Sequence, residues 1–185
     1  MNLKNFEQNF LHKKVKKINT LKTEIPNIPE LICPSLIQIH TKNYNFIYQT
    51  IEKELENNYC LWIDTDHCTD FARFNPKNLL ISQPNSPEEA LNILSEPLLK
   101  CLKIVVIDSV LNLLPLNRDY VWLEKKMGEI RQIMRNTDCI IFFINPYIQN
   151  KYDIFEKYMD YIIKIDKNTG KVVKNIKNLK INHNQ

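Results

Sequence analysis

The chain of 185 residues contains only 2 glycines, whereas average usage of roughly 7 % would supply about 13. The phosphate-binding motif G-x-x-x-x-G-K-[ST] needs two glycines within six positions, and the dinucleotide-binding motif G-x-G-x-x-G needs three. Gly128 and Gly170 are too far apart along the sequence to share either motif. The composition therefore excludes nucleotide binding by either of these loops.

The sequence also lacks the segments that direct a protein into or across a membrane. Its most apolar stretch, 98–116, is interrupted by Lys103 and Asp108 and falls short of the roughly 18 apolar residues of a membrane span. The first ten residues, MNLKNFEQNF, contain no apolar segment typical of a signal peptide. With 44 % hydrophobic and 25 % charged residues, the composition is that of one soluble domain, and we expect a cytoplasmic protein.

Cysteine is present, but not in the patterns of a disulfide framework or a zinc knuckle. The five cysteines are odd in number, widely spaced and never arranged as C-x-x-C. Cys60 and Cys68, with His67 beside the latter, form the only cluster that a metal could use, and no second ligand pair accompanies them. We therefore expect a reducing compartment, no metal and no cofactor.

The net charge of +4 is unevenly distributed along the chain. Residues 1–25 and 161–185 contain six lysines each, so that the middle of the chain is acidic. Basic ends are typical of nucleic-acid contact. However, Lys, Asn and Ile together make up 69 of 185 residues, a bias that an AT-rich coding sequence would also produce, so solvated tails remain the alternative.

Hydrophobic periodicity predicts alternating strands and helices. Residues 1–22 read as a basic amphipathic helix, and the proline-containing segment 23–34 as a connector. Apolar runs typical of strands lie at 36–40, 59–63, 78–82, 103–107 and 139–144. Helical periodicity extends over 43–58, 86–99 and 119–135, the second helix starting at a Ser86 N-cap.

This alternation predicts an α/β fold with a mostly parallel central sheet that is covered by helices on both faces. Two final strands, 160–166 and 171–176, are expected to form an antiparallel hairpin with Asn168 and Gly170 in its turn. The predicted core domain is 35–176, and a basic tail follows at 177–185.

Several segments resemble, in order and in spacing, the successive core segments of bacterial RecA recombinases. They are LWIDTDH (61–67), NLLISQP (78–84) with EAL (89–91), IVVIDSV (104–110) with LP (114–115), IFFIN (141–145) and KVVKN (171–175). The segment NFEQNF (5–10) resembles the N-terminal helix of the family. The resemblance covers nearly the whole chain and implies a RecA-like three-layer sandwich.

The resemblance fails at the phosphate-binding loop. Where the family has G-x-E-S-S-G-K-T after its first core strand, this chain has TKNYNFI at 41–47. Thr41, Lys42 and Asn43 contain no glycine, and no Ser or Thr that could bind magnesium follows the lysine. Bulky residues cannot form the same cradle of backbone N–H groups, so the resemblance implies that triphosphate is not bound in the usual way.

Two carboxylates occupy positions at which the family carries catalytic groups. Asp108 stands at the Walker B position, where the family holds magnesium, and Asp66 stands where the water-activating glutamate would be. Pro146 replaces the glutamine that relays the nucleotide state to the DNA loop. Each carboxylate also has a simpler interpretation, as a cap of the turn that follows its strand.

The segments that correspond to the DNA-binding loops of the family are shortened. The first lies between Pro115 and Asp119, and the second, within 147–158, is expected to be short and helical. The family's C-terminal domain is also expected to be missing, because the sequence ends soon after the KVVKN strand. We therefore do not expect an autonomous recombinase.

The leading hypothesis is a catalytically inactive RecA-like pseudo-ATPase that acts by protein–protein interaction in DNA recombination or repair. Its expected partner is another RecA-like subunit or a recombination or repair protein, which Phe6, Phe10 and Leu11 of the N-terminal helix would contact. A regulator of SOS mutagenesis or of cell division on the same fold is an alternative.

Two further hypotheses follow from charged residues. A module that binds single-stranded DNA would use charge and stacking, with candidate lysines Lys125, Lys126, Lys151, Lys171 and Lys174. An enzyme would instead need a divalent metal among carboxylates at the carboxyl edge of the sheet, namely Asp64, Asp66, Asp70 and Asp108. No Ser, Cys or His pattern indicates a hydrolase triad.

Overall fold

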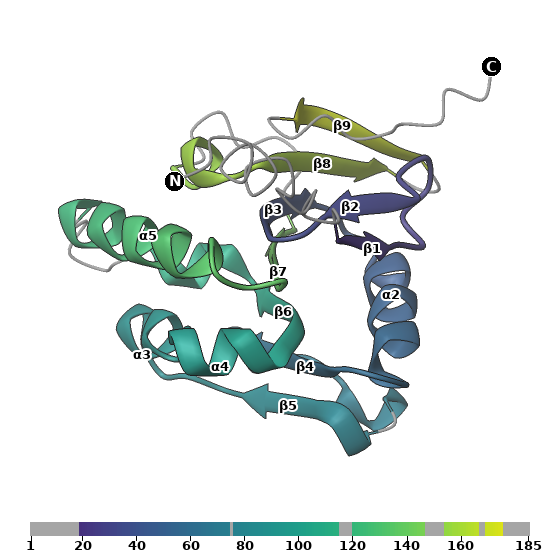
Figure 1. Ribbon diagram of the computed structural model, residues 1–185, viewed down its shortest axis with the longest axis horizontal. Helices are drawn as coiled ribbons and strands as arrows, with labels where there is room; N and C mark the ends of the chain where they lie inside the picture. The colour runs from purple at the N-terminus through teal and green to yellow at the C-terminus, as the bar shows by residue number, and fades with distance from the viewer. Residues whose placement is uncertain (1–18, 75, 115–119, 147–153, 167–168, 176–185) are drawn as a thin grey trace, which may run out of the picture.

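The computed structural model describes residues 19–74, 76–114, 120–146, 154–166 and 169–175 (Figure 1). The expected N-terminal helix, apart from its last residues, and the basic tail lie outside these residues. The expected helix in 147–158 lies partly outside them, and Glu156–Tyr158 form a single 3-10 turn.

A seven-stranded sheet has the order β5-β4-β6-β7-β3-β8-β9. Its strands are β3 (Ser35–His40), β4 (Tyr59–Asp64), β5 (Leu79–Ser82), β6 (Leu102–Asp108), β7 (Ile140–Asn145), β8 (Tyr161–Asp166) and β9 (Thr169–Asn175). All neighbouring strands are parallel except β9, which is antiparallel to β8. The predicted mostly parallel sheet with a C-terminal antiparallel hairpin is therefore confirmed.

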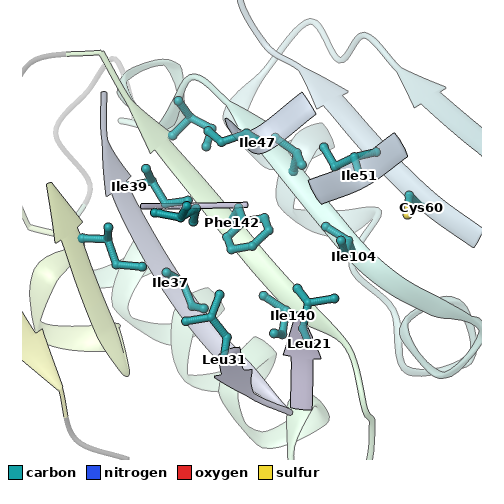
Figure 2. Close-up of a cluster of buried hydrophobic side chains, with 14 of the residues drawn as sticks. Leu21, Leu31, Ile37, Ile39, Ile47, Ile51, Cys60, Ile104, Ile140 and Phe142 are labelled. Atoms are coloured by element: carbon teal, nitrogen blue, oxygen red, sulfur yellow. The ribbon is translucent and has the colours of Figure 1, made fainter. Parts of the chain in front are cut away.

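Helices cover both faces of the sheet (Figure 1). One face packs against α2 (Asn45–Leu55), and the other packs against α3 (Pro87–Asn92), α4 (Glu96–Cys101) and α5 (Tyr120–Met134). Successive side chains of a strand point to opposite faces, so Ile37 of β3 lies in the core beneath α2 and Leu36 in the core beneath α5. Figure 2 shows the first of these cores. None of the described helices is long and apolar enough to cross a membrane.

The segment expected to end a helix and then run as a connector forms a two-stranded antiparallel ribbon instead. Its strands are β1 (Thr20–Lys22) and β2 (Glu30–Ile32). Leu21 pairs with Leu31, and both side chains are fully buried in the core beneath α2. The prediction was wrong here because burial of these two leucines outweighs the local proline-rich composition.

The helix predicted for 86–99 is divided into α3 and α4. Its start is as expected, because Ser86 Oγ accepts a hydrogen bond from the Glu89 N–H at 3.1 Å. Pro97 lies in the first turn of α4. A proline there has no N–H to donate, and its ring clashes with the carbonyl group four residues earlier, so one continuous helix cannot pass through this position.

Gly170 is not part of the hairpin turn, as the sequence had suggested, but lies within β9 opposite Ile165. A Cβ atom at this position would lie 2.3 Å from the carbonyl oxygen of Pro26, in the loop that joins β1 to β2. The glycine is needed because another segment of backbone approaches the strand closely. This contact holds the ribbon against the β8–β9 hairpin.

Replacing each of the two glycines by alanine should therefore change the free energy of unfolding in opposite directions. Gly128 lies in α5 with nothing within 4 Å of an added Cβ, so Gly128→Ala should raise the free energy of unfolding by about 0.5–1 kcal/mol through helix propensity. Gly170→Ala should lower it by about 1–3 kcal/mol through steric overlap. Urea unfolding followed by tryptophan fluorescence measures both, and changes of the same sign would contradict the Gly170–Pro26 contact.

Candidate functional site

Buried polar side chains gather at the carboxyl edge of the sheet, where ligands of α/β proteins generally bind. Asp64 ends β4, Asp108 ends β6 and Asn145 ends β7, while Thr41 follows β3. All four are buried. Because the strands are parallel and adjacent, residues that are distant in sequence come together at this edge.

Asp108 is the central group of this edge. Its Oδ1 atom accepts a hydrogen bond from the Tyr44 hydroxyl at 2.9 Å. Burial raises the pKa of the Asp108 carboxyl to about 6, and the nearby carboxylates of Asp66 and Asp64 act in the same direction. The hydrogen bonds from Tyr44 and Thr69 partly oppose this increase. The ionised form of Asp108 is thus stabilised by hydrogen-bond donors that the protein itself supplies.

Tyr44 connects Asp108 to a cluster of aromatic rings that we call the aromatic cluster: Tyr44, Tyr48, Trp62, Phe71 and Phe74. Burial, together with the charge of Asp108, raises the pKa of the Tyr44 hydroxyl, so this group remains a donor at neutral pH. The ring centroids of Tyr44 and Tyr48 are 5.9 Å apart, and Tyr48 stacks on Trp62 at 5.4 Å. Phe71 and Phe74 pack around Trp62. The cluster fixes the start of α2 against β4.

In the segment Thr41–Asn45, which stands where the phosphate-binding loop was expected, three backbone N–H groups donate to acceptors of the protein itself. The Thr41 N–H donates to the Asn145 carbonyl oxygen at 3.0 Å. The Asn43 N–H donates to Thr41 Oγ1 at 2.9 Å, and the Asn45 N–H donates to Asn43 Oδ1 at 3.1 Å. Lys42 is exposed. These N–H groups do not form a cradle that faces a ligand.

Asp64 holds the loop that follows β4. Its carboxylate accepts hydrogen bonds from the N–H groups of Cys68 and Thr69, both at 3.3 Å, and from Gln83 Nε2 at 3.1 Å. Asp66 is exposed and accepts a hydrogen bond from Asn112. Asp64 therefore caps the turn after its strand, the role that had been the simpler alternative for Asp66 and Asp108.

The metal site required by the enzyme hypothesis is not formed. Within the described residues, no three His, Cys, Asp or Glu side chains are grouped so that they could hold a metal ion. Asp64, Asp66 and Asp108 thus do not form a ligand set. Asp70 instead caps the 3-10 turn Phe71–Arg73 by accepting a hydrogen bond from the Ala72 N–H at 3.0 Å.

The other candidate residues are dispersed. Lys125 and Lys126 lie on α5, where Lys126 pairs with Glu129 at 3.1 Å, whereas Lys171 lies on β9. These lysines are in different layers of the fold and do not form one stripe along which a nucleic acid could run. The candidates Phe6, Phe10, Leu11 and Lys151 lie outside the described residues, as does the side chain of Lys174.

Sequence reasoning missed Tyr44 as the partner of Asp108. The spacing of Tyr44 and Tyr48, four residues apart, predicts that the two rings lie on one side of the start of a helix, but it does not indicate that Tyr44 contacts Asp108. It also missed Arg131 of α5, which donates to Asp160 Oδ1 at 2.9 Å and to the Tyr158 carbonyl oxygen at 2.8 Å. The second oxygen of Asp160 accepts a hydrogen bond from the Leu36 N–H at 2.9 Å, which fixes the start of β8 against β3.

These features define an α/β protein with a parallel sheet and a buried carboxylate at its carboxyl edge. No protein-family model matches the chain. Protein RecA from Wolbachia sp. subsp. Brugia malayi (strain TRS) is 30 % identical over 51 % of this chain. The matching region is 32 % of that relative's own length.

A crystal structure of the RadB recombinase superposes on this chain with a TM-score of 0.56 at 13 % sequence identity. The superposition covers 82 % of each chain. This protein therefore has a RecA-like core, as the resemblance of its core segments had implied.

The raised pKa of Asp108 predicts how stability depends on pH. Because the pKa is about 6 in the folded protein and 3.8 ordinarily, protonation of Asp108 stabilises the fold at low pH. This stabilisation is lost as the pH rises through about 6. Asp108→Asn cannot ionise, so its stability relative to the wild type should increase between about pH 4 and pH 7, by up to about 3 kcal/mol.

Urea unfolding across this pH range measures the effect. Asp166→Asn, which alters an exposed carboxylate at the end of β8, serves as the control and should show no comparable trend. If the difference in the free energy of unfolding between Asp108→Asn and the wild type stayed constant across this pH range, the raised pKa would be contradicted.

Proposed function

We propose that this protein is a nucleotide-independent RecA-like accessory protein that acts in DNA recombination or repair through contact with another protein. The observation that carries the proposal is the hydrogen bond from Tyr44 to Asp108. In the RecA-like frame, Asp108 stands at the position that holds the magnesium of a bound nucleotide. Here a tyrosine from the degenerate phosphate loop uses that carboxylate as its acceptor.

The loop itself supports this proposal. To present a cradle to phosphate, the Thr41–Asn45 segment would have to break the hydrogen bonds that the N–H groups of Thr41, Asn43 and Asn45 donate. Each such bond contributes about 0.5–1.5 kcal/mol. Tyr44 would also have to leave the aromatic cluster. No glycine is present in the segment to permit the left-handed or closely packed backbone that phosphate loops use.

We expect no saturable binding of ATP in the presence of magnesium, measured by titration calorimetry, and no phosphate release with or without single-stranded DNA. A bacterial RecA recombinase assayed in parallel serves as the positive control. Saturable, magnesium-dependent binding that is lost in both Lys42→Ala and Asp108→Asn would refute nucleotide independence, because Lys42 follows β3, Asp108 ends β6, and both lie at the carboxyl edge where the nucleotide would bind.

The proposed partner is another RecA-like subunit, which the apolar residues of the N-terminal segment would contact. Immobilised protein should retain a RecA recombinase from the same cell, and Phe6→Ala, Phe10→Ala and Leu11→Ala combined should reduce retention at least tenfold. Lys125→Ala, an exposed change on α5, serves as the control and should leave retention unchanged. Equal retention by the triple variant would rule out this mode of contact.

A further inference from the structure

A groove with a volume of about 330 Å³ lies beside the candidate site, at the carboxyl edge of the sheet. The segments that follow β4, β5 and β6 form its walls. Half of its lining residues are apolar, namely Pro84, Pro87, Leu111 and Leu114. Its volume is at the lower end of the range of about 300–1,000 Å³ that is typical of ligand pockets, so it has room for a few side chains of a binding segment.

Three of the four polar lining residues have side chains that are bonded within the protein. Thr65 Oγ1 donates to the Ser109 carbonyl oxygen at 2.8 Å, and Asn112 Nδ2 donates to the Thr65 carbonyl oxygen at 3.0 Å. Ser86 Oγ is the cap of α3 described above. What the groove offers to a binding segment is therefore mainly the apolar surface of its prolines and leucines, of which Leu114 is 37 % exposed.

The segments that border the groove are acidic. No lysine or arginine is present in these three segments, residues 64–70, 83–89 and 109–114. They contain five acidic residues, and four of these are exposed: Asp66, Asp70, Glu88 and Glu89. The same negative charge acts on the buried Asp108, because Asp64 and Asp66 both raise its pKa. A segment that occupies the groove should therefore combine apolar side chains with positive charge.

The first eighteen residues of this chain have the required composition. They include five lysines but only one acidic residue, and two phenylalanines, Phe6 and Phe10, lie among them. We propose that this N-terminal segment binds in the groove of its own chain, with Phe6 and Phe10 against the apolar lining and the lysines facing the acidic segments. The proposed recombination partner needs the same phenylalanines, so it would have to displace the N-terminal segment from the groove.

The N-terminal segment is long enough to reach the groove of the same chain. Asn19 lies near the start of β6, because its carbonyl oxygen accepts a hydrogen bond from the Cys33 N–H at 2.9 Å, and Lys103 Nζ donates to Cys33 Sγ at 3.8 Å. The groove lies beyond the other end of β6, which has 7 residues and is therefore about 23 Å long. Gln8 lies eleven residues before Asn19, so an extended chain carries it up to about 36 Å from Asn19.

Disulfide trapping of the full chain under mild oxidation, at low protein concentration, tests the proposal. Cys68 is exposed in the segment after β4, at the groove, whereas Cys101 is exposed directly before β6, at the opposite edge of the sheet. In Gln8→Cys protein with Cys101→Ser, we expect an intramolecular disulfide to Cys68. It should form at least tenfold faster than the disulfide to Cys101 in Gln8→Cys protein with Cys68→Ser.

Two outcomes of this comparison would overturn the proposal. An N-terminal segment that is not held in the groove would reach Cys68 no faster than Cys101, because Asn19 lies near the start of β6. A disulfide between two chains, seen as a dimer on a non-reducing gel, would show that the segment occupies the groove of a second copy instead.

Substitutions on each side of the contact show whether the groove itself holds the segment. Leu114→Lys should slow trapping at Cys68 at least tenfold, and Phe6→Ala combined with Phe10→Ala should do the same without altering the folded core. Val121→Lys replaces another exposed apolar side chain, 77 % exposed on α5, and should leave the rate unchanged. High salt should slow trapping by screening the charges. Trapping that persists in the phenylalanine variant would overturn the proposal, and no partner is present, so this result is separate from the retention experiment.

Discussion

The carboxylate of Asp108 lies inside the protein, and the surrounding structure is arranged so that it can stay there. A buried carboxylate without donors is strongly destabilising, and Tyr44 supplies the donor. Tyr44 is held in turn by the aromatic cluster, which joins the start of α2 to β4 and to the 71–74 segment. The hydrogen bond between Tyr44 and Asp108 therefore joins the loop after β3 to the end of β6. Through the aromatic cluster, it also depends on the packing of α2 against β4.

Most of the sheet could be predicted from the sequence because its central strands are nearly continuous apolar runs. Strands β6 and β7 are buried almost throughout, and such runs, alternating with amphipathic helices, have few other stable arrangements. The β1–β2 ribbon could not be predicted in this way. Its strands have 3 residues each, and what stabilises them is the burial of Leu21 and Leu31 against segments that are distant in sequence.

The site was predictable in position but only partly in its chemistry. The place of Asp108 after an apolar strand indicated a carboxylate at the carboxyl edge, and the lack of glycine near Thr41 indicated that a phosphate cradle would not form. The partner of Asp108 depends on where the Tyr44 ring points, and no local pattern determines that direction. Likewise, four aspartates near one edge suggested a metal site, but Asp64 and Asp70 each turn towards backbone N–H groups of their own loop.

The contact between Gly170 and the carbonyl oxygen of Pro26 has a consequence for the order in which the molecule forms during synthesis. The ribbon is made before all the other described strands, whereas the hairpin against which it rests is made after all of them. Strand β3 likewise needs both β7 and β8 beside it. This half of the sheet must therefore wait until β8 and β9 have been made, whereas β4, β5 and β6 are neighbours in sequence and can pair before then.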